Sequence, residues 1–171
     1  MMAAIHRDDL DLAASAAVTI GKSADTVWTL WLDPATLPRI MAPIAQVEPI
    51  DADTADWIMD APLGRTLRWK TQIVEKSEDR IRWTSLDGAD VPNAGTLILR
   101  PAPGDLGTEV TLDLRFGPPG GLLGTGIAKL FHVVPREMVM KTLYNFRALA
   151  LTGEVPTTEP QPAARNGGMD K

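Results

Sequence analysis

The segment from residue 44 to residue 116 constrains the fold most, because it consists of short, partly apolar runs separated by turn residues. Most of the runs are separated by only a few residues, rich in Gly, Pro and Asp. Such short connections join antiparallel neighbours, since parallel strands need long crossovers. The sequence therefore predicts an antiparallel meander of six strands: Ile44–Ile50, Ala55–Ala61, Arg65–Lys76, Arg80–Ser85, Gly95–Arg100 and Thr108–Phe116.

Alternation within these strands predicts a sheet with one buried and one solvent-exposed face. In residues 108–116 every second residue is apolar, and the residues between them are mostly charged. Residues 67–73 and 80–85 follow the same rule, with Arg, Lys and Gln on the polar side. Side chains two apart share a face of a strand, so another element must cover the apolar face.

The segments before the meander predict one strand and two short helices. Residues 16–20 alternate and end at Gly21, which indicates a first strand. Ser23 or Asp25 can cap a helix that runs to Leu32, and Pro34 begins a second helical turn that ends near Met41.

After the meander, helical spacing of apolar residues runs from Leu123 to Leu149 and stops at Gly153. This long amphipathic helix is the element expected to cover the sheet. Pro135 predicts a kink near residues 132–134, since proline interrupts the helical hydrogen bonds.

Composition bounds the class of protein. The chain has 171 residues, 44% of them hydrophobic and 23% charged, which suits one globular core. Its net charge of −5 argues against a nucleic-acid partner. The absence of cysteine excludes disulfides and thiolate chemistry and fits a cytoplasmic location. We see no signal peptide and no transmembrane segment.

Domain boundaries follow from the same patterns. Residues 1–14 are predicted to be a flexible leader, residues 15–154 one ligand-binding domain, and residues 155–171 a disordered tail rich in Pro, Thr, Gln, Asn and Gly.

Local phrases along the chain resemble those of one known superfamily. In chain order they are Val27-Trp28, Leu37-Pro38-Arg39 with Met41, Trp57, Ala61-Pro62-Leu63-Gly64, Trp69, Trp83-Thr84-Ser85, Gly95, Gly107-Thr108-Glu109-Val110, Pro118-Pro119-Gly120-Gly121, Ala128-Lys129-Leu130-Phe131, Pro135, Phe146 and Thr152-Gly153-Glu154. With the order of elements, they resemble the START-like, or SRPBCC, superfamily, in its bacterial polyketide cyclase/dehydrase-like and coenzyme Q-binding branch.

This resemblance implies an α+β helix-grip fold in the order β-α-α-β6-α, with a curved seven-stranded antiparallel sheet around a long C-terminal helix. It also implies a pocket between sheet and helix for an apolar small molecule, such as a lipid, quinone or polyketide. Relatives either carry such ligands or catalyse cyclisation or dehydration in the same cavity, and the fold alone does not choose between these activities.

Aromatic and hydroxyl side chains are the candidate ligand contacts. Trp57, Trp69 and Trp83 all lie in the meander, where they either wall a pocket or simply fill a core. Thr71 and Ser85 place hydroxyls on the apolar faces of their strands. There each hydroxyl needs a hydrogen-bond partner, which is water, a polar group of a ligand or a nearby carbonyl. The predicted cavity lining is Trp57, Met59, Trp69, Thr71, Trp83, Ser85, Leu112, Leu114, Phe116, Ile127, Phe131, Met138 and Tyr144.

Two of these predictions carry an equal alternative. Tyr144 points its hydroxyl into the pocket or keeps it in water. The loop Pro119, Gly120, Gly121, Leu122 and Leu123 is an entrance that admits ligand and touches a membrane surface transiently, or it only connects two elements.

Residues for chemistry are scarce. His6 and His132 are the only histidines and His6 lies in the leader, so we expect no metal site, no catalytic triad and no cofactor. We assign no catalytic residue. The preferred function is a carrier or sensor of an apolar ligand, the alternative is a cofactor-independent cyclase or dehydrase, and a third is a module whose exposed sheet face binds a partner. The ligand's identity and the oligomeric state stay open.

Overall fold

A computed structural model of the chain describes residues 12–42, 44–61, 64–117 and 134–156. Within them the order of elements is strand, two helices, six strands and a long helix, with one 3-10 turn before the last strand. The bounds are β1 Leu12–Ile20, α1 Ala24–Leu32, α2 Thr36–Met41, β2 Gln46–Pro49, β3 Thr54–Ala61, β4 Arg65–Lys76, β5 Arg80–Ser85, β6 Asn93–Pro101, η3 Pro103–Asp105, β7 Thr108–Phe116 and α4 Val134–Thr152.

The strands form one antiparallel seven-stranded sheet in the order β1-β7-β6-β5-β4-β3-β2. The predicted meander is confirmed, and β1 joins it beside the last strand. β1 begins at Leu12 rather than Ala16, because its pairing with β7 extends to Leu12 opposite Phe116. The first residues of this strand therefore lie in the segment that the sequence assigned to a leader.

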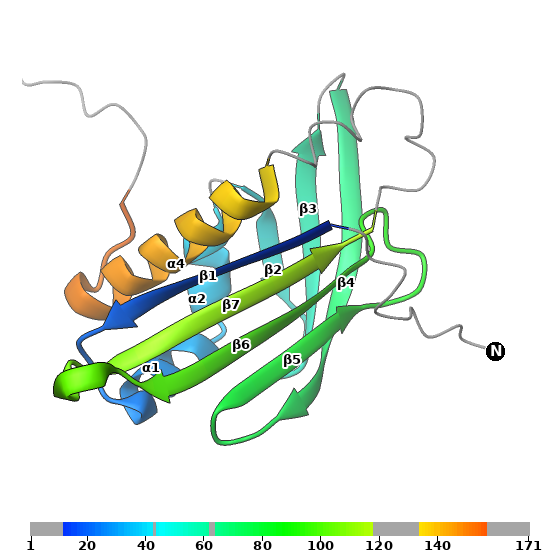
Figure 1. Cartoon of the computed structure of the whole chain (residues 1–171). Helices are drawn as coiled ribbons and strands as arrows, with labels where there is room; N and C mark the ends of the chain where they lie inside the picture. Colours follow the sequence, from blue (N-terminus) through cyan, green and yellow to red (C-terminus); the bar gives the residue numbers. More distant parts are fainter. Residues whose placement is uncertain (1–11, 43, 62–63, 118–133, 157–171) are drawn as a thin grey trace, which may run out of the picture.

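The sheet is strongly curled. Figure 1 shows β3 and β4 standing steeply against the direction of β1 and β7. The pairing of β4 with β5 shifts register between Ile73 and Glu75. Such a bulge bends a strand and increases its twist, which contributes to the curl.

Helix α4 covers the inner face of one half of the sheet, where it packs chiefly on β1 and β7 (Figure 1). Val139, Leu143 and Phe146 point inward from α4 and are completely buried. They share one core with residues of the inner sheet face, including Val18 and Val110. This packing confirms that the C-terminal helix covers the sheet.

The two short helices close one end of this core. The Ser23 hydroxyl accepts a hydrogen bond from the Thr26 amide at 3.2 Å, so the predicted cap of α1 is confirmed. Helix α2 begins at Thr36, two residues later than predicted. The Asp33 carboxylate accepts from the Ala35 amide at 2.9 Å, which keeps these residues in a turn ahead of the helix.

The C-terminal boundary agrees with the sequence at Gly153, whose positive φ of 76° follows the last turn of α4. Pro135 lies in the first turn of α4, where a missing amide proton costs little. The predicted helical residues 123–133 lie outside the described residues, and so does most of the predicted kink. Val155 packs against the core although the sequence assigned it to the tail.

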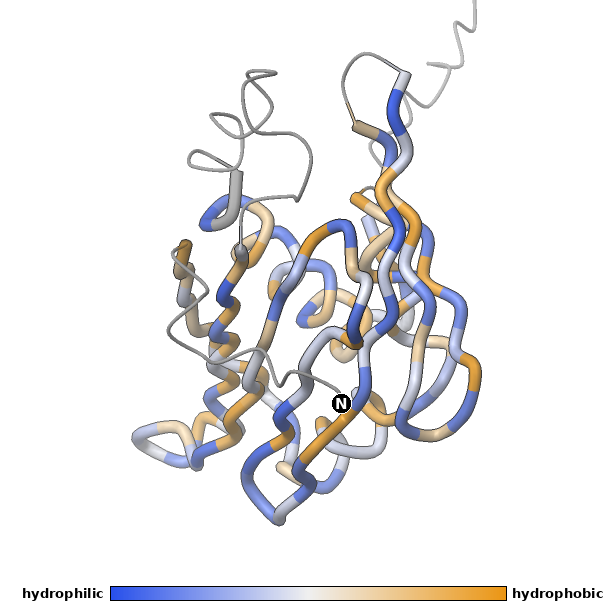
Figure 2. The backbone as a smooth tube through the Cα atoms, turned by 90° about the vertical axis from the view of Figure 1, so that its right-hand side faces the viewer, coloured by the Kyte–Doolittle hydropathy of each residue, from blue (hydrophilic) through white to orange (hydrophobic). Residues whose placement is uncertain are grey.

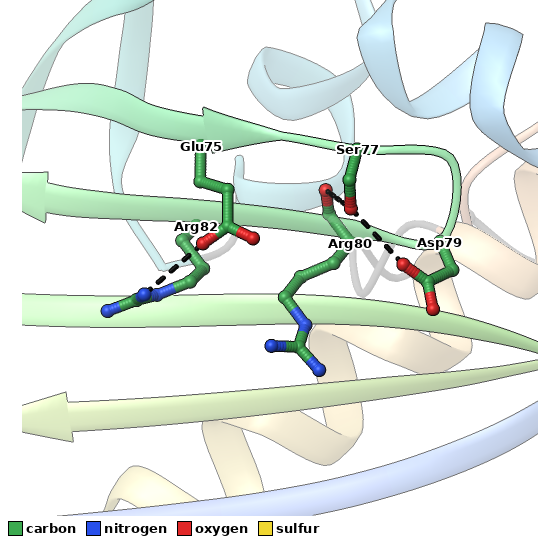
Figure 3. A network of polar contacts seen from close by, with 5 residues as sticks. All are labelled: Glu75, Ser77, Asp79, Arg80 and Arg82. Carbon is green, nitrogen blue, oxygen red and sulfur yellow. Dashed lines mark hydrogen bonds and ion pairs between the residues drawn. The ribbon is translucent and has the colours of Figure 1, made fainter.

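The outer face of the sheet is polar, as predicted. Figure 2 shows hydrophilic and hydrophobic residues alternating along the strands. On this face Arg82 pairs with Glu75 at 3.2 Å, and the Ser77 hydroxyl donates to the Asp79 carboxylate at 3.1 Å in the turn between β4 and β5 (Figure 3). Exposed ion pairs of this kind contribute little to stability, so the polar side chains mainly make this face of the sheet compatible with water. In the part of the chain that the structure describes, no helix is long and apolar enough to cross a membrane.

Candidate ligand-binding cavity

A partly open cavity of about 390 Å³ lies on the inner side of the sheet, beyond the region that α4 covers. Its wall is mainly apolar and comes from β3, β4, β5, β7, the α1–α2 region and the start of α4. Most of the predicted lining residues are in this wall: Trp57, Met59, Trp69, Thr71, Trp83, Leu112, Leu114, Phe116 and Met138.

Other predicted contacts lie elsewhere. Ser85 is buried but is absent from the cavity wall, and its hydroxyl accepts from the Asn93 amide at 3.0 Å. Tyr144 is not among the cavity residues and takes the alternative predicted for it, with its side chain in water: it is 49% exposed, and the Arg147 guanidinium lies 5.6 Å from its ring centre. On α4 the buried face holds its neighbours Leu143 and Asn145. Helical spacing alone could not fix which boundary residue turns outward.

Several predictions fall on residues outside the described ranges. These are the cavity residues Ile127 and Phe131, the entrance loop Pro119, Gly120, Gly121, Leu122 and Leu123, and the histidine His132.

The α1–α2 region supplies lining residues that the sequence reasoning missed. Trp31, Leu37 and Met41 belong to the wall. Trp31 also packs edge-on against Phe146, with ring centres 5.1 Å apart, so it serves core and cavity together. Val27 and Trp31 are one helical turn apart and share a face of α1, but such spacing does not reveal what lies across from that face.

Two tryptophans form a stacked pair in the wall. Trp57 on β3 and Trp69 on β4 are directly opposite in the pairing register. Their ring centres are 5.9 Å apart and their planes differ by 9°. This cross-strand stack presents an extended aromatic surface at low conformational cost.

A third tryptophan lies flat on the sheet because its partner is a glycine. Trp83 on β5 is opposite Gly95 on β6. A Cβ atom at Gly95 would lie only 2.1 Å from Cζ2 of Trp83 and 2.8 Å from Cδ2 of Leu114. Gly95 therefore lets the indole ring settle onto β6, and the depth of the cavity depends on this pair.

Three buried polar side chains, those of Thr71, Asn93 and Thr142, interrupt the apolar wall, and each has a hydrogen-bond partner. The Trp57 indole N–H donates to the Thr71 hydroxyl at 2.8 Å. Asn93 donates its side-chain N–H to the Val91 carbonyl at 2.8 Å, and Thr142 donates to the Met138 carbonyl at 2.8 Å. Thr71 and Ser85 thus act as acceptors for N–H groups, whereas the structural alternative foreseen from the sequence was donation to a carbonyl.

Carboxylates occur only at the rim among the described lining residues. They are Asp33, Asp51, Asp53 and Asp60, and all four are exposed.

Two of these rim carboxylates, those of Asp51 and Asp53, already have hydrogen-bond or ion-pair partners. Asp51 accepts from the Asp53 and Thr54 amides at 2.8 Å each, and the Asp53 amide is the main cause that lowers the pKa of Asp51. Asp53 itself pairs with Lys76 at 2.7 Å. A general acid or base needs a buried, tuned group, and the described wall places none beside the tryptophans. Nor do the described residues group His, Asp or Glu side chains in a way that could hold a metal ion.

Comparison with known proteins gives one family. The family model described as "Polyketide cyclase / dehydrase and lipid transport" matches residues 20–142, which is more than half of the chain. No curated protein matches the sequence significantly.

Solved structures share the fold over most of the chain. A Deinococcus radiodurans protein is 31% identical with a TM-score of 0.63, and the match covers 84% of this chain and 99% of that one. A Thermus thermophilus protein is 22% identical with a TM-score of 0.69, over 83% and 99% of the two chains. The di-domain ARO/CYC protein StfQ from the steffimycin biosynthetic pathway is 16% identical with a TM-score of 0.60, over 85% of this chain and 52% of StfQ. The last two likenesses speak for the fold alone.

Proposed function

Because the chain belongs to the polyketide cyclase/dehydrase and lipid transport family, we propose that it binds and carries an apolar small molecule in the cavity beside α4. The observation that carries this proposal is the wall itself. It encloses a volume of about 390 Å³ with a largely apolar surface that includes tryptophans and three buried, hydrogen-bonded polar side chains. Small-molecule sites have this character: mostly apolar, of a few hundred Å³, with few polar groups.

The driving force for binding is removal of apolar surface from water. Trp57, Trp69 and Met59 are only partly buried in the described structure, so part of their surface is free to be covered by a ligand. Each Å² of apolar surface removed from water contributes roughly 25 cal/mol. A ligand of lipid, quinone or polyketide type offers the matching apolar surface.

A cyclase or dehydrase is the alternative, since the family's description names both activities. That reaction needs a group in the cavity that moves a proton. The carboxylates of the described wall are exposed at the rim, and the pKa of Asp51 is lowered rather than raised toward neutrality. These features favour carriage over catalysis. The third function, a module whose exposed sheet face binds a partner, would leave the pocket without a role and free to be filled by its own side chains, and the cavity volume speaks against this.

Native mass spectrometry of the purified protein, followed by organic extraction, tests the proposal. Leu114→Trp should fill the cavity and remove a copurified compound, because Leu114 lines the wall. Arg115→Trp is the matched control, since the next residue of β7 is exposed and points to the outer face. A bound compound present in both the wild type and Leu114→Trp would contradict the cavity as its site. A compound that the protein returns chemically changed after incubation would favour the enzyme.

A further inference from the structure

We propose that the cavity selects ligands that carry a hydrogen-bond acceptor, and that the Thr71 hydroxyl is the donor that recognises it. The inference rests on the proposed function and adds a chemical requirement to it. The ligand is then an apolar body with a ketone, quinone, ester or ether oxygen, rather than a pure hydrocarbon surface.

The argument begins with the direction of one hydrogen bond. An indole N–H can only donate, so at 2.8 Å from Trp57 the Thr71 oxygen must be the acceptor. A hydroxyl has one proton in addition to its acceptor lone pairs. Trp57 therefore leaves Thr71 with a proton to donate elsewhere.

The Thr71 side chain has little contact with solvent. Thr71 is 7% exposed, and its side chain faces the cavity among apolar residues of β4. Within the described residues, the bond from Trp57 is the one hydrogen bond recorded for its hydroxyl. A buried donor without an acceptor costs free energy, and an oxygen of a bound ligand would remove that cost.

Two other hydroxyls, those of Thr142 and Ser85, each lack one of the two properties that Thr71 combines. Thr142 also lines the cavity, but its proton is donated to the Met138 carbonyl at 2.8 Å. Ser85 lies opposite Thr71 in the register and also accepts an N–H, yet it is not part of the wall. Thr71 alone among these three combines an unused proton with a place in the wall.

The stacked tryptophans would place the ligand oxygen near this proton. Trp69 and Thr71 are two residues apart on β4, so they share its inner face. An apolar ring lying against the Trp57–Trp69 stack would bring a substituent on its edge toward the hydroxyl.

A matched pair of probes tests the inference: 1-tetralone, which carries a ketone, and tetralin, which lacks it. The dissociation constants of both are measured by calorimetry on the full chain. One neutral hydrogen bond should make 1-tetralone bind the wild type about five- to tenfold more tightly. Equal affinity for the two probes would overturn the inference and leave the proposed function standing, whereas failure of both probes to bind would count against the proposed function as well.

Variants assign the preference to Thr71. Thr71→Val leaves the Trp57 N–H without an acceptor, so the double variant Trp57→Phe/Thr71→Val is compared with Trp57→Phe alone. The ratio of the two dissociation constants should fall to about one in the double variant and persist in Trp57→Phe and in Thr71→Ser. A ratio that survives in the folded double variant would overturn the role of Thr71, because a merely structural effect would move both affinities together.

Discussion

The two halves of the sheet present their inner faces to different neighbours. Under α4, the strands β1 and β7 meet Val139, Leu143 and Phe146, and these helix residues are completely buried. At the other half, Trp57 and Trp69 on β3 and β4 remain partly exposed beside an open volume. The strands of both halves alternate in the same way, so the pattern alone does not distinguish them.

The difference shows how one sheet can supply both stability and a binding site. Close packing under α4 removes apolar surface from water within the protein itself. Among the described residues, the other half leaves part of the apolar surface of Trp57 and Trp69 unburied at the cavity. Substitutions in the packed half should therefore mainly lower the free energy of unfolding, whereas substitutions in the other half should mainly weaken ligand binding.

The strongest effect should come from the packed half. Phe146 is 0% exposed and meets Trp31 edge-on, so Phe146→Ala should lower the free energy of unfolding by about 3–5 kcal/mol. Urea denaturation measures this change. Tyr144→Ala, two residues earlier on the exposed side of α4, should cost far less. Similar losses for both would show that the packed half does not dominate stability.

Substitutions at the boundary of the cavity should destabilise the protein less than those in the packed half. In Gly95→Ala the new methyl group meets the Trp83 ring, which must tilt toward the cavity. We expect a loss of about 1–3 kcal/mol from overpacking, together with weaker ligand binding. Gly21→Ala is the control, because no atom lies within 4 Å of its added Cβ. Unchanged binding in Gly95→Ala would contradict the role of this pair in setting the cavity's depth.

The open half should separate binding from stability. Trp69→Leu removes half of the stacked pair from a partly exposed position, so the loss of stability should stay below about 2 kcal/mol. The affinity for an apolar ligand should fall clearly in the same calorimetric titration. Lys70→Gln, next in the strand on the outer face, should leave the affinity unchanged. The comparison between the halves fails if Trp69→Leu destabilises the protein as much as Phe146→Ala.

The rim should contribute the smallest and most pH-dependent effect. Hydrogen bonds from the Asp53 and Thr54 amides lower the pKa of Asp51 below its usual 3.8. A carboxylate with a lowered folded pKa stabilises the protein above its unfolded pKa, and this contribution is lost as the pH falls through the folded pKa. Asp51→Asn should therefore differ slightly from the wild type in urea denaturation at about pH 6, and the difference should shrink by about pH 3. A difference that grows on acidification would contradict the assignment.

The sequence predicted most elements because their signals are local. The bounds of β4, β5 and β7 agree with the expected ranges, and the Ser23 cap and the Gly153 stop are as expected. The early start of β1 at Leu12 was missed because that strand owes its length to pairing with β7. Pairing between segments a hundred residues apart leaves little trace in either segment.

The candidate site divides in the same way. Period-two alternation placed Trp69 and Thr71 on the apolar face of their strand, and the cavity wall contains both. On the helices, the prediction placed Tyr144 in the wall, with exposure to water as an equal alternative, and it left out Trp31. Helical spacing has broad boundaries between faces, so residues at those boundaries are placed only by their neighbours.

The sequence by itself determined the antiparallel sheet, its two faces and the helix that covers it, since hydrophobic periodicity and turn residues act within a few positions. Only the tertiary structure decided which inward-facing residues belong to the packed core and which line the cavity. That division depends on which strands α4 packs against, on the position of the Trp83 ring over Gly95 and on the hydrogen bond in which the Thr71 hydroxyl accepts the Trp57 N–H. Each is a contact between different strands or helices, and alternation along one strand carries no information about what lies across from it.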